Sequence, residues 1–238
     1  MRKKGGHAMS ENMEVTKRLP KDFSTSMPFY RVKLKRKKWY EITKRIIDIV
    51  LSFIGLIVLS PLLLWVAFRI YFEEPGQPIF FSQERVGKDK QLFKIYKFRS
   101  MCVDAEKKLP TLLYKNEVEG AMFKIKEDPR VTKFGKFIRK TSLDELPQLW
   151  NVLKGDMSLV GPRPPLLREV AQYTKYDEQR LLVKPGCTGL WQISGRSNVG
   201  FSEMVSLDLE YIEKRSLFID CKIIYRTIFV ILHPEGAC

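Results

Sequence analysis

Two adjacent carboxylates, Asp144 and Glu145, lie within a basic stretch, RKTSLDELPQLWNVLKGDMSLVGPR, that runs from Arg139 to Arg163. An ionised aspartate could act as a nucleophile that accepts a phosphoryl group, and the neighbouring glutamate could help to hold Mg²⁺ against substrate phosphates. Arg139 and Lys140 upstream, and Arg163 in a Gly-Pro-Arg-Pro turn downstream, would neutralise charge on the phosphoryl oxygens. The stretch is therefore a candidate site for chemistry on phosphates.

The same two carboxylates also fit the start of a helix. Ser142 followed by Glu145 matches a capping box, whereas Pro147 fits best in a first turn and favours a start nearer Asp144. Either start places both carboxylates at a helix N-terminus, where the helix dipole favours their ionised form. An ordinary helix start is the competing interpretation of the motif. Apolar residues then recur at helical spacing, at Leu143, Leu146, Leu149, Trp150 and Leu153.

Two segments upstream would bring further cations towards the motif. Residues 79–87 and 90–101 are rich in β-branched and aromatic residues and are joined by a Gly-Lys-Asp-Lys turn, which predicts a β-hairpin. In its second strand Lys97 and Arg99 alternate with aromatic residues, so both cations should face one side. A half-exposed strand with a polar face explains that pattern equally well. A short helix ending at the basic pair before the motif is predicted by Phe134, Phe137 and Ile138.

The composition indicates a protein whose partners are anions. The chain has 238 residues and a formal net charge of +15, which favours partners such as phosphorylated small molecules, nucleic acid or an anionic membrane. Its four cysteines are scattered and include no Cys-x-x-Cys pair, so neither a disulfide framework nor a zinc site is expected. Residues 1–43 read as a basic, largely irregular extension.

One strongly apolar segment follows this extension. It runs from Ile46 to Phe72, and the 20 residues from Ile49 to Phe68 carry no charge, which is enough to span a bilayer as a helix. Pro61 cannot donate to the Ile57 carbonyl, so a kink is expected at Ser60-Pro61.

Both flanks of the segment are basic, and positive residues favour the cytoplasmic side. A helix that enters the membrane, bends and returns to the same face satisfies both flanks, so we expect a re-entrant structure; a plain crossing and a buried core helix are the alternatives. Ser60 or Lys44-Arg45 could bond the backbone groups that the bend leaves free. Interfacial positions are expected for Trp39, Tyr40, Trp65 and Tyr71.

The C-terminal third offers weaker signals. Residues 104–120 and 166–180 look helical, residues 122–126 suit a short strand, and residues 184–200 look like a loop. Arg180 and Arg196 could contact a nucleotide or lipid phosphate, or could simply be surface arginines. Residues 202–216 predict an amphipathic helix. Residues 217–232 could lie on a membrane surface or pack into the core, and the pattern does not separate these alternatives.

Other function classes explain only part of the chain. Nucleic-acid binding would account for the charge but not for the apolar segment or the Asp-Glu pair. A non-catalytic membrane anchor that recruits partners gives no reason for the phosphate-ready residues around Asp144. A Walker-type kinase is excluded because the sequence has no G-x-x-x-x-G-K-[ST] motif, and no D-x-D triplet supports a metal-dependent glycosyltransferase of that type.

Several uncommon blocks occur together in a specific order. They are KRIIDIVLS, Leu-Ser-Pro, PIFFSQERVGK, FKIYKFRSM, DPRVTKFGKFIRKTSLDELPQLWNVLKGDMSLVGPRP and PGCTGLWQISGRS. With these blocks, from Lys44 onwards, the chain resembles the bacterial sugar transferases, the monotopic enzymes that transfer a sugar 1-phosphate to a polyprenyl phosphate.

The resemblance implies an activity and a set of partners. Such proteins transfer a sugar 1-phosphate from a UDP-sugar to undecaprenyl phosphate at the inner leaflet of the bacterial cell membrane and release UMP, at the start of exopolysaccharide, capsule or O-antigen synthesis. The PG-x-TGLWQ-x-SGR block favours glucose or galactose as the sugar, with an N-acetylated sugar as the alternative. No nucleic-acid partner is implied, and a homodimer is left open.

The resemblance also assigns roles to residues. It implies that Asp144 is the nucleophile that forms a covalent phosphosugar intermediate and that Glu145 is its Mg²⁺-linked partner. Arg139 and Arg163 would hold substrate phosphate, and Lys97 and Arg99 fall in a block associated with the active site. The membrane kink and anchor would be formed by Lys44, Arg45, Ser60 and Pro61.

The expected fold is a helix-rich α+β structure. A re-entrant kinked membrane helix over residues 44–72 would be followed by a cytoplasmic catalytic domain, residues 73–238, that contains a small β-hairpin and amphipathic helices.

Overall fold

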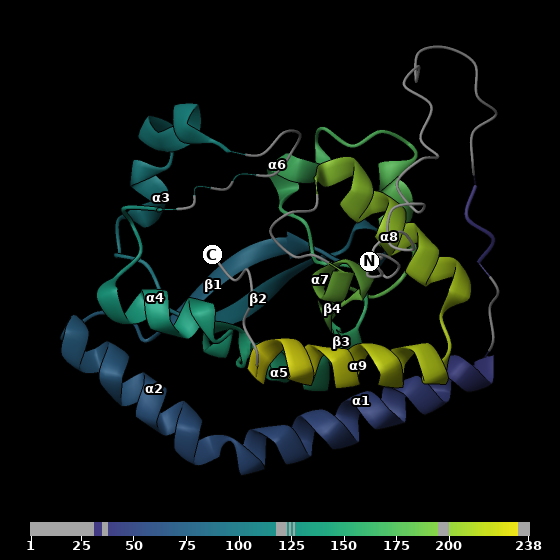
Figure 1. Ribbon diagram of the computed structural model, residues 1–238, viewed down its shortest axis with the longest axis horizontal. Coiled ribbons are helices and arrows are strands. Elements are labelled where there is room, and N and C mark those ends of the chain that lie inside the picture. Colours follow the sequence, from purple (N-terminus) through teal and green to yellow (C-terminus); the bar gives the residue numbers. More distant parts are fainter. Residues whose placement is uncertain are drawn as a thin grey trace, which may run out of the picture. The chain divides into compact units, whose positions relative to one another are not determined.

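The computed structural model describes residues 31–34, 38–117, 123, 125, 127–194 and 200–232 (Figure 1). It has the expected helix-rich α+β character. The N-terminal extension up to residue 30, most of the strand expected at 122–126, and Arg196 lie outside the described residues. The α-helices are α1 (Lys38–Val58), α2 (Ser60–Glu73), α3 (Ala105–Lys108), α4 (Lys133–Lys140), α5 (Gln148–Lys154), α6 (Leu167–Val170), α7 (Leu190–Ser194), α8 (Phe201–Lys214) and α9 (Leu217–Leu232).

Four strands and four short 3₁₀ helices complete the described elements. The strands are β1 (Phe80–Val86), β2 (Leu92–Phe98), β3 (Ser158–Val160) and β4 (Gly186–Thr188), and the 3₁₀ helices are η1 (Lys88–Lys90), η2 (Pro110–Lys115), η3 (Leu143–Glu145) and η4 (Asp177–Leu182). The helical interpretations of residues 104–120 and 166–180 are confirmed only in part, because short helices alternate there with turns.

The apolar segment forms a bent helix pair, α1 and α2, with a 61° bend between the two arms. The bend falls where it was expected, since Pro61 sits in the first turn of α2. The Ser60 hydroxyl donates to the Ile57 carbonyl at 2.7 Å, so Ser60 bonds the backbone group that the proline leaves without a partner. Lys44 and Arg45 do not serve the bend, because their side chains bond to other elements.

The two arms of the bent helix pair expose much of their apolar surface. Among the described residues, Val66 and Ile70 of α2 are buried in a hydrophobic cluster with Phe98 and Ile138, and Leu62, Leu63 and Ala67 pack partly buried against it. No single helix in the described part of the chain is long and apolar enough to cross a bilayer, but the two arms together meet that criterion. A buried core helix is wrong, because the large exposed side chains include Ile46, Ile49, Val50, Phe53, Ile54, Ile57, Val58, Leu64, Trp65 and Phe68.

Strands β1 and β2 form the expected antiparallel hairpin, with Phe80 opposite Phe98 and Val86 opposite Leu92. Its turn is η1, where Asp89 has a left-handed φ of 52°. A second, parallel sheet joins β3 to β4. A loop was expected at 184–200, but β4 and α7 lie within the described part of that range, and residues 195–199 lie outside the described residues. Gly186 is required in β4 because a side chain there would collide with the backbone of Gly161.

Helices α8 and α9 build the main hydrophobic cluster with β3. Helix α8 is the expected amphipathic helix, with Met204, Val205 and Ile212 buried. Helix α9 packs into the core with one face, where Ile223 is buried in the cluster, whereas Phe218 is 77% exposed. That the exposed face lies on a membrane surface stays a prediction.

Trp39, Trp65 and Tyr71 are exposed, as an interfacial role requires. Tyr40 is not, because it is buried and its hydroxyl donates to Asp220 of α9 at 2.9 Å.

Candidate active site

The two carboxylates lie in η3, the tight turn that joins α4 to α5. The capping box is wrong: Ser142 adopts a left-handed conformation with φ of 56°, and its side chain does not cap the turn. Pro147 precedes α5, so this helix begins only at Gln148. Asp144 and Glu145 therefore lie in a single 3₁₀ turn between two α-helices, and not in the first turn of an α-helix.

The ends of α4 are defined by local chemistry. Thr132 caps its start, because its hydroxyl accepts a hydrogen bond from the Gly135 amide at 2.9 Å. Gly135 also lets the helix pack tightly, since any side chain there would collide with the Ser100 carbonyl beyond β2. Arg139 and Lys140 fall in the last turn, as expected. Helix α4 thus places two cations next to the start of the carboxylate turn.

Glu145 forms an ion pair with Lys97 of β2, at 2.7 Å between Oε1 and Nζ. Desolvation around the carboxyl group works to raise its pKa, but Lys97, followed by Arg163 and Arg85, outweighs this effect. The pKa of Glu145 is consequently lowered from its ordinary value. Glu145 is thus held as a carboxylate by the charges of three cations.

Asp144 differs from its neighbour because it is buried, with 7% of its surface exposed. Burial raises the pKa of Asp144 to about 6, and the nearby charge of Glu145 adds to the rise, while Lys97 and Arg139 oppose it. The pKa lowering expected for a carboxylate at a helix N-terminus is therefore not found for Asp144, whereas the pKa of Glu145 is lowered, chiefly by Lys97. At neutral pH Asp144 is still mostly ionised, and a carboxylate with a raised pKa is more basic and hence more nucleophilic.

Arg85 belongs to the site but was not predicted from the sequence. It is buried on β1, donates to the Pro164 carbonyl at 3.0 Å and acts electrostatically on Glu145. Burial, then the charge of Arg163, lowers the pKa of Arg85 to about 10. Strand pairing could have revealed it, because Phe81 lies opposite Lys97, and Arg85 shares the face of β1 that carries Phe81.

The remaining cations divide between the site and the core. Arg163 lies close enough to act on Glu145 and also pairs with Glu169 at 3.2 Å. Arg99 instead pairs with Glu74 at the end of α2, at 3.4 Å. Lys97 and Arg99 therefore contact different carboxylates, although they are two residues apart.

Arg180 does not face a ligand or the surface. Its side chain is 1% exposed and forms an ion pair with Asp208 of α8 at 2.6 Å, and it also donates to the Tyr173 hydroxyl. Burial raises the pKa of Asp208 to about 6, although Arg180 opposes the rise. Arg180 holds η4 against α8, so its expected contact with substrate phosphate is replaced by a structural role.

The carboxylate pair matches one mode of magnesium binding. In the described ranges no cluster of three or more His, Cys, Asp or Glu side chains is arranged to hold a metal ion. Mg²⁺ at phosphate-handling sites is usually bound by one or two carboxylates together with substrate phosphates. Asp144 and Glu145 supply such a donor set, which fits an ion shared with the substrate.

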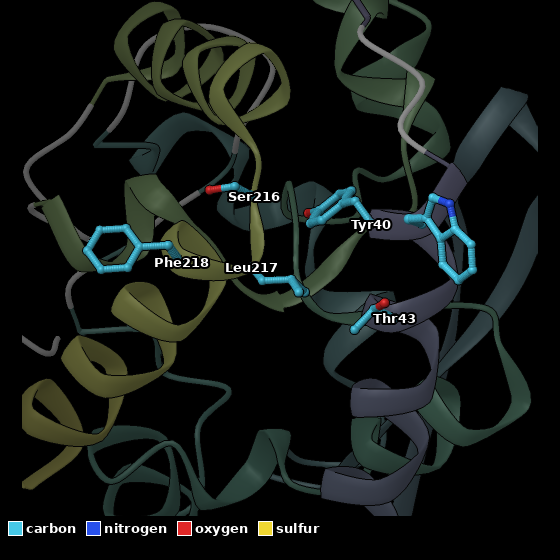
Figure 2. A pocket seen from close by; sticks show the side chains of 6 residues that line it. Tyr40, Thr43, Ser216, Leu217 and Phe218 are labelled. Atoms are coloured by element: carbon cyan, nitrogen blue, oxygen red, sulfur yellow. The ribbon is translucent and has the colours of Figure 1, made fainter.

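A surface hollow lies elsewhere, between the starts of α1 and α9 (Figure 2). Trp39, Tyr40 and Thr43 line it from α1, and Ser216, Leu217 and Phe218 line it from the other side. It contains no residue of the carboxylate turn.

The fold and the site define a helix-rich α+β protein in which a carboxylate turn is surrounded by cations beside a bent apolar helix pair. The chain belongs to the bacterial sugar transferase family, whose profile matches residues 39–234. The resemblance seen in the sequence motifs is thereby confirmed.

Three relatives illustrate the match. A galactosyl transferase CpsE of Streptococcus agalactiae is 49% identical over 213 residues, which cover 89% of this chain and 46% of the relative. An undecaprenyl-phosphate galactose phosphotransferase of Salmonella typhimurium is 45% identical over 198 residues, 82% of this chain and 41% of the relative. An exopolysaccharide production protein ExoY of Sinorhizobium fredii is 40% identical over 200 residues, 82% of this chain and 88% of the relative. The chain thus spans less than half the length of the first two relatives.

Proposed function

We propose that this protein transfers a sugar 1-phosphate from a UDP-sugar to undecaprenyl phosphate and releases UMP. The observation that carries the proposal is the turn at Asp144 and Glu145: a buried carboxylate with a raised pKa stands beside a second carboxylate that Lys97 and Arg163 keep ionised. Family membership and the name of the Salmonella relative support the same reaction.

Asp144 is the nucleophile in this proposal. Its carboxylate oxygen attacks the phosphorus that carries the sugar, and the bond from that phosphorus to the bridging oxygen breaks, so that UMP leaves with the bridging oxygen. An oxygen of undecaprenyl phosphate then attacks the same phosphorus. The bond to Asp144 breaks, the free carboxylate returns, and the product is a lipid diphosphate sugar.

The surrounding charges serve both steps. Arg139 and Arg163 neutralise charge that develops on the phosphoryl oxygens. Lys97 orients Glu145 through its 2.7 Å ion pair. Asp144 and Glu145 are the residues that would hold Mg²⁺, which when bound would polarise the phosphoryl oxygens and stabilise the leaving phosphate. Burial of Asp144 excludes water, which limits hydrolysis of the phosphosugar intermediate.

The bent helix pair is proposed to be re-entrant in the inner leaflet of the bacterial membrane, with the catalytic domain on the cytoplasmic face. The 61° bend and the exposed apolar side chains of both arms support this arrangement. A cysteine introduced in residues 1–30 should then react with an impermeant reagent only from the cytoplasmic side. Labelling from the outside would establish a full crossing instead.

The sugar is proposed to be galactose or glucose, with an N-acetylated sugar as the alternative. Release of UMP from a panel of UDP-sugars in the presence of undecaprenyl phosphate and Mg²⁺ tests the reaction and the sugar together. Asp144→Asn and Glu145→Gln should each abolish release while membrane association persists. Normal turnover by Asp144→Asn would rule out the covalent route.

A further inference from the structure

We propose that the bent helix pair positions the catalytic turn formed by Asp144 and Glu145. Arg45 of α1 and Glu73 of α2 would act as positioning residues, because each bonds one of the two helices that flank this turn. The effect on turnover rests on the proposed function. The effect on structure does not.

Arg45 forms hydrogen bonds with the end of α5. Its Nη1 donates to the Val152 carbonyl at 2.6 Å, and its Nη2 donates to the Leu153 carbonyl at 2.8 Å. The last carbonyls of a helix have no partner within the helix, and they form the negative end of its dipole. The Val152 carbonyl also accepts from the capping Gly155 amide at 3.0 Å, and the two fixed donors of the guanidinium group bond both carbonyls at once. Arg45 therefore fixes the far end of α5 to α1.

Glu73, whose charge is opposite to that of Arg45, accepts hydrogen bonds from the start of α4. Its Oε1 accepts from the Phe134 amide and its Oε2 accepts from the Thr132 hydroxyl, both at 2.9 Å. The first amides of a helix lack partners and form the positive end of its dipole, so a carboxylate suits this end as a guanidinium suits the other. Trp65 of α2 packs edge-on against Phe134, with ring centroids 5.7 Å apart, and supports the same junction.

Arg45 and Glu73 bond the outer ends of the two helices that meet at the catalytic turn. Helix α4 runs from its contact with Glu73 towards the turn, and α5 runs from the turn to its contact with Arg45. Figure 1 shows α4 next to α2 and α5 next to α1, so each flanking helix rests on a different arm. The angle between the arms consequently sets how α4 and α5 are placed relative to each other.

A need to attach α1 to the rest of the domain does not by itself explain the contacts of Arg45 and Glu73. Lys44, adjacent to Arg45, pairs with Asp220 of α9 at 2.9 Å, and Asp48 accepts from the Leu159 amide at 3.0 Å. These bonds already fix α1 to the rest of the domain. Arg45 and Glu73 differ from them because their partners are the helices that carry the turn.

The test compares Arg45→Met and Glu73→Gln with Glu41→Gln, in the full chain reconstituted in lipid nanodiscs. Glu41 is the matched control: it is a carboxylate on α1 that pairs with Arg215, outside the flanking helices. Displacements of about 1 Å at a reacting group cost about 10²-fold in rate. We expect kcat for UMP release to fall about 10- to 100-fold in both variants, with KM for the UDP-sugar changed less than about threefold. Arg45→Lys should restore part of the loss.

A second readout keeps the inference separate from the proposed function. Amide hydrogen exchange over residues 141–154 should accelerate in Arg45→Met and Glu73→Gln but not in Glu41→Gln. If the wild type released no UMP from any UDP-sugar, the proposed function would fail. Amide hydrogen exchange alone would then test the positioning role of Arg45 and Glu73. Exchange in the turn equal to that of the control, or an unchanged kcat per folded molecule, would overturn the inference.

Discussion

Replacing the proposed nucleophile should make the protein more stable at neutral pH. Burial raises the pKa of Asp144 to about 6 from an ordinary value of 3.8. The contribution of Asp144 to stability is therefore complete only well below pH 3.8, where the carboxyl group is neutral in both the folded and the unfolded state, and it is lost as the pH rises through 6. A rise of roughly two pKa units corresponds to about 3 kcal/mol, and because only 7% of Asp144 is exposed, solvent screens little of it.

Asp144→Asn should recover most of that cost above pH 7 while abolishing transfer. For a domain of this size about 3 kcal/mol corresponds to a rise in Tm of very roughly 10 °C. The assay is thermal unfolding in detergent micelles with EDTA present, from pH 4.5 to 8.5. The difference between variant and wild type should be small at the acid end and grow through pH 6 to a plateau.

Glu145→Gln is the matched control, with the opposite sign. The pKa of Glu145 is lowered, so its ion pair with Lys97 stabilises the fold above the ordinary carboxyl pKa and is lost as the pH falls. This variant should be less stable than the wild type at neutral pH. An Asp144→Asn protein whose Tm differs from that of the wild type by the same amount at every pH would refute the burial argument.

Three further outcomes follow from contacts described above. Lys97→Met removes a charge that lowers the pKa of Asp144, so the acidic limb of the pH profile of kcat/KM for UMP release should move to higher pH; an unmoved limb would contradict this assignment. Arg180→Met leaves Asp208 buried without its cation and should cost about 3–5 kcal/mol in denaturant unfolding, whereas a loss below 1 kcal/mol would show that the site relaxes. Pro61→Ala restores an amide that can bond the Ile57 carbonyl, so impermeant labelling should detect some chains with an external N-terminus.

Much of the local structure was predictable because it depends on neighbours in sequence. The β-hairpin follows from two strand-forming segments around a short turn, and the bend follows from a proline that cannot donate to Ile57. The helix that carries Arg139 follows from apolar spacing over residues 133–140. In each case, the residues that determine the structure lie within one element or its turn.

The misplaced residues have partners far along the chain. Tyr40 is buried because Asp220 accepts its hydroxyl, and Arg180 is buried because Asp208 lies on α8. The pairing of β3 with β4 involves only two three-residue strands, which leave no alternation to detect.

The left-handed turn at Ser142 was missed for a different reason. The motif fits an ordinary capping box, whereas the turn contacts α4 and also β2, a strand far from it in the sequence. The raised pKa of Asp144 was missed as well, because burial depends on such distant contacts.

The exposed apolar surface of α1 and α2 has a kinetic consequence. If this surface is immersed in lipid and the acceptor is undecaprenyl phosphate, as proposed above, enzyme and acceptor diffuse in the same plane. Encounter in the second step then depends on the mole fraction of acceptor in the bilayer and not on its bulk concentration. Adding inert lipid at constant protein and acceptor should slow that step by surface dilution, while loading of Asp144 from the dissolved nucleotide sugar should be unaffected.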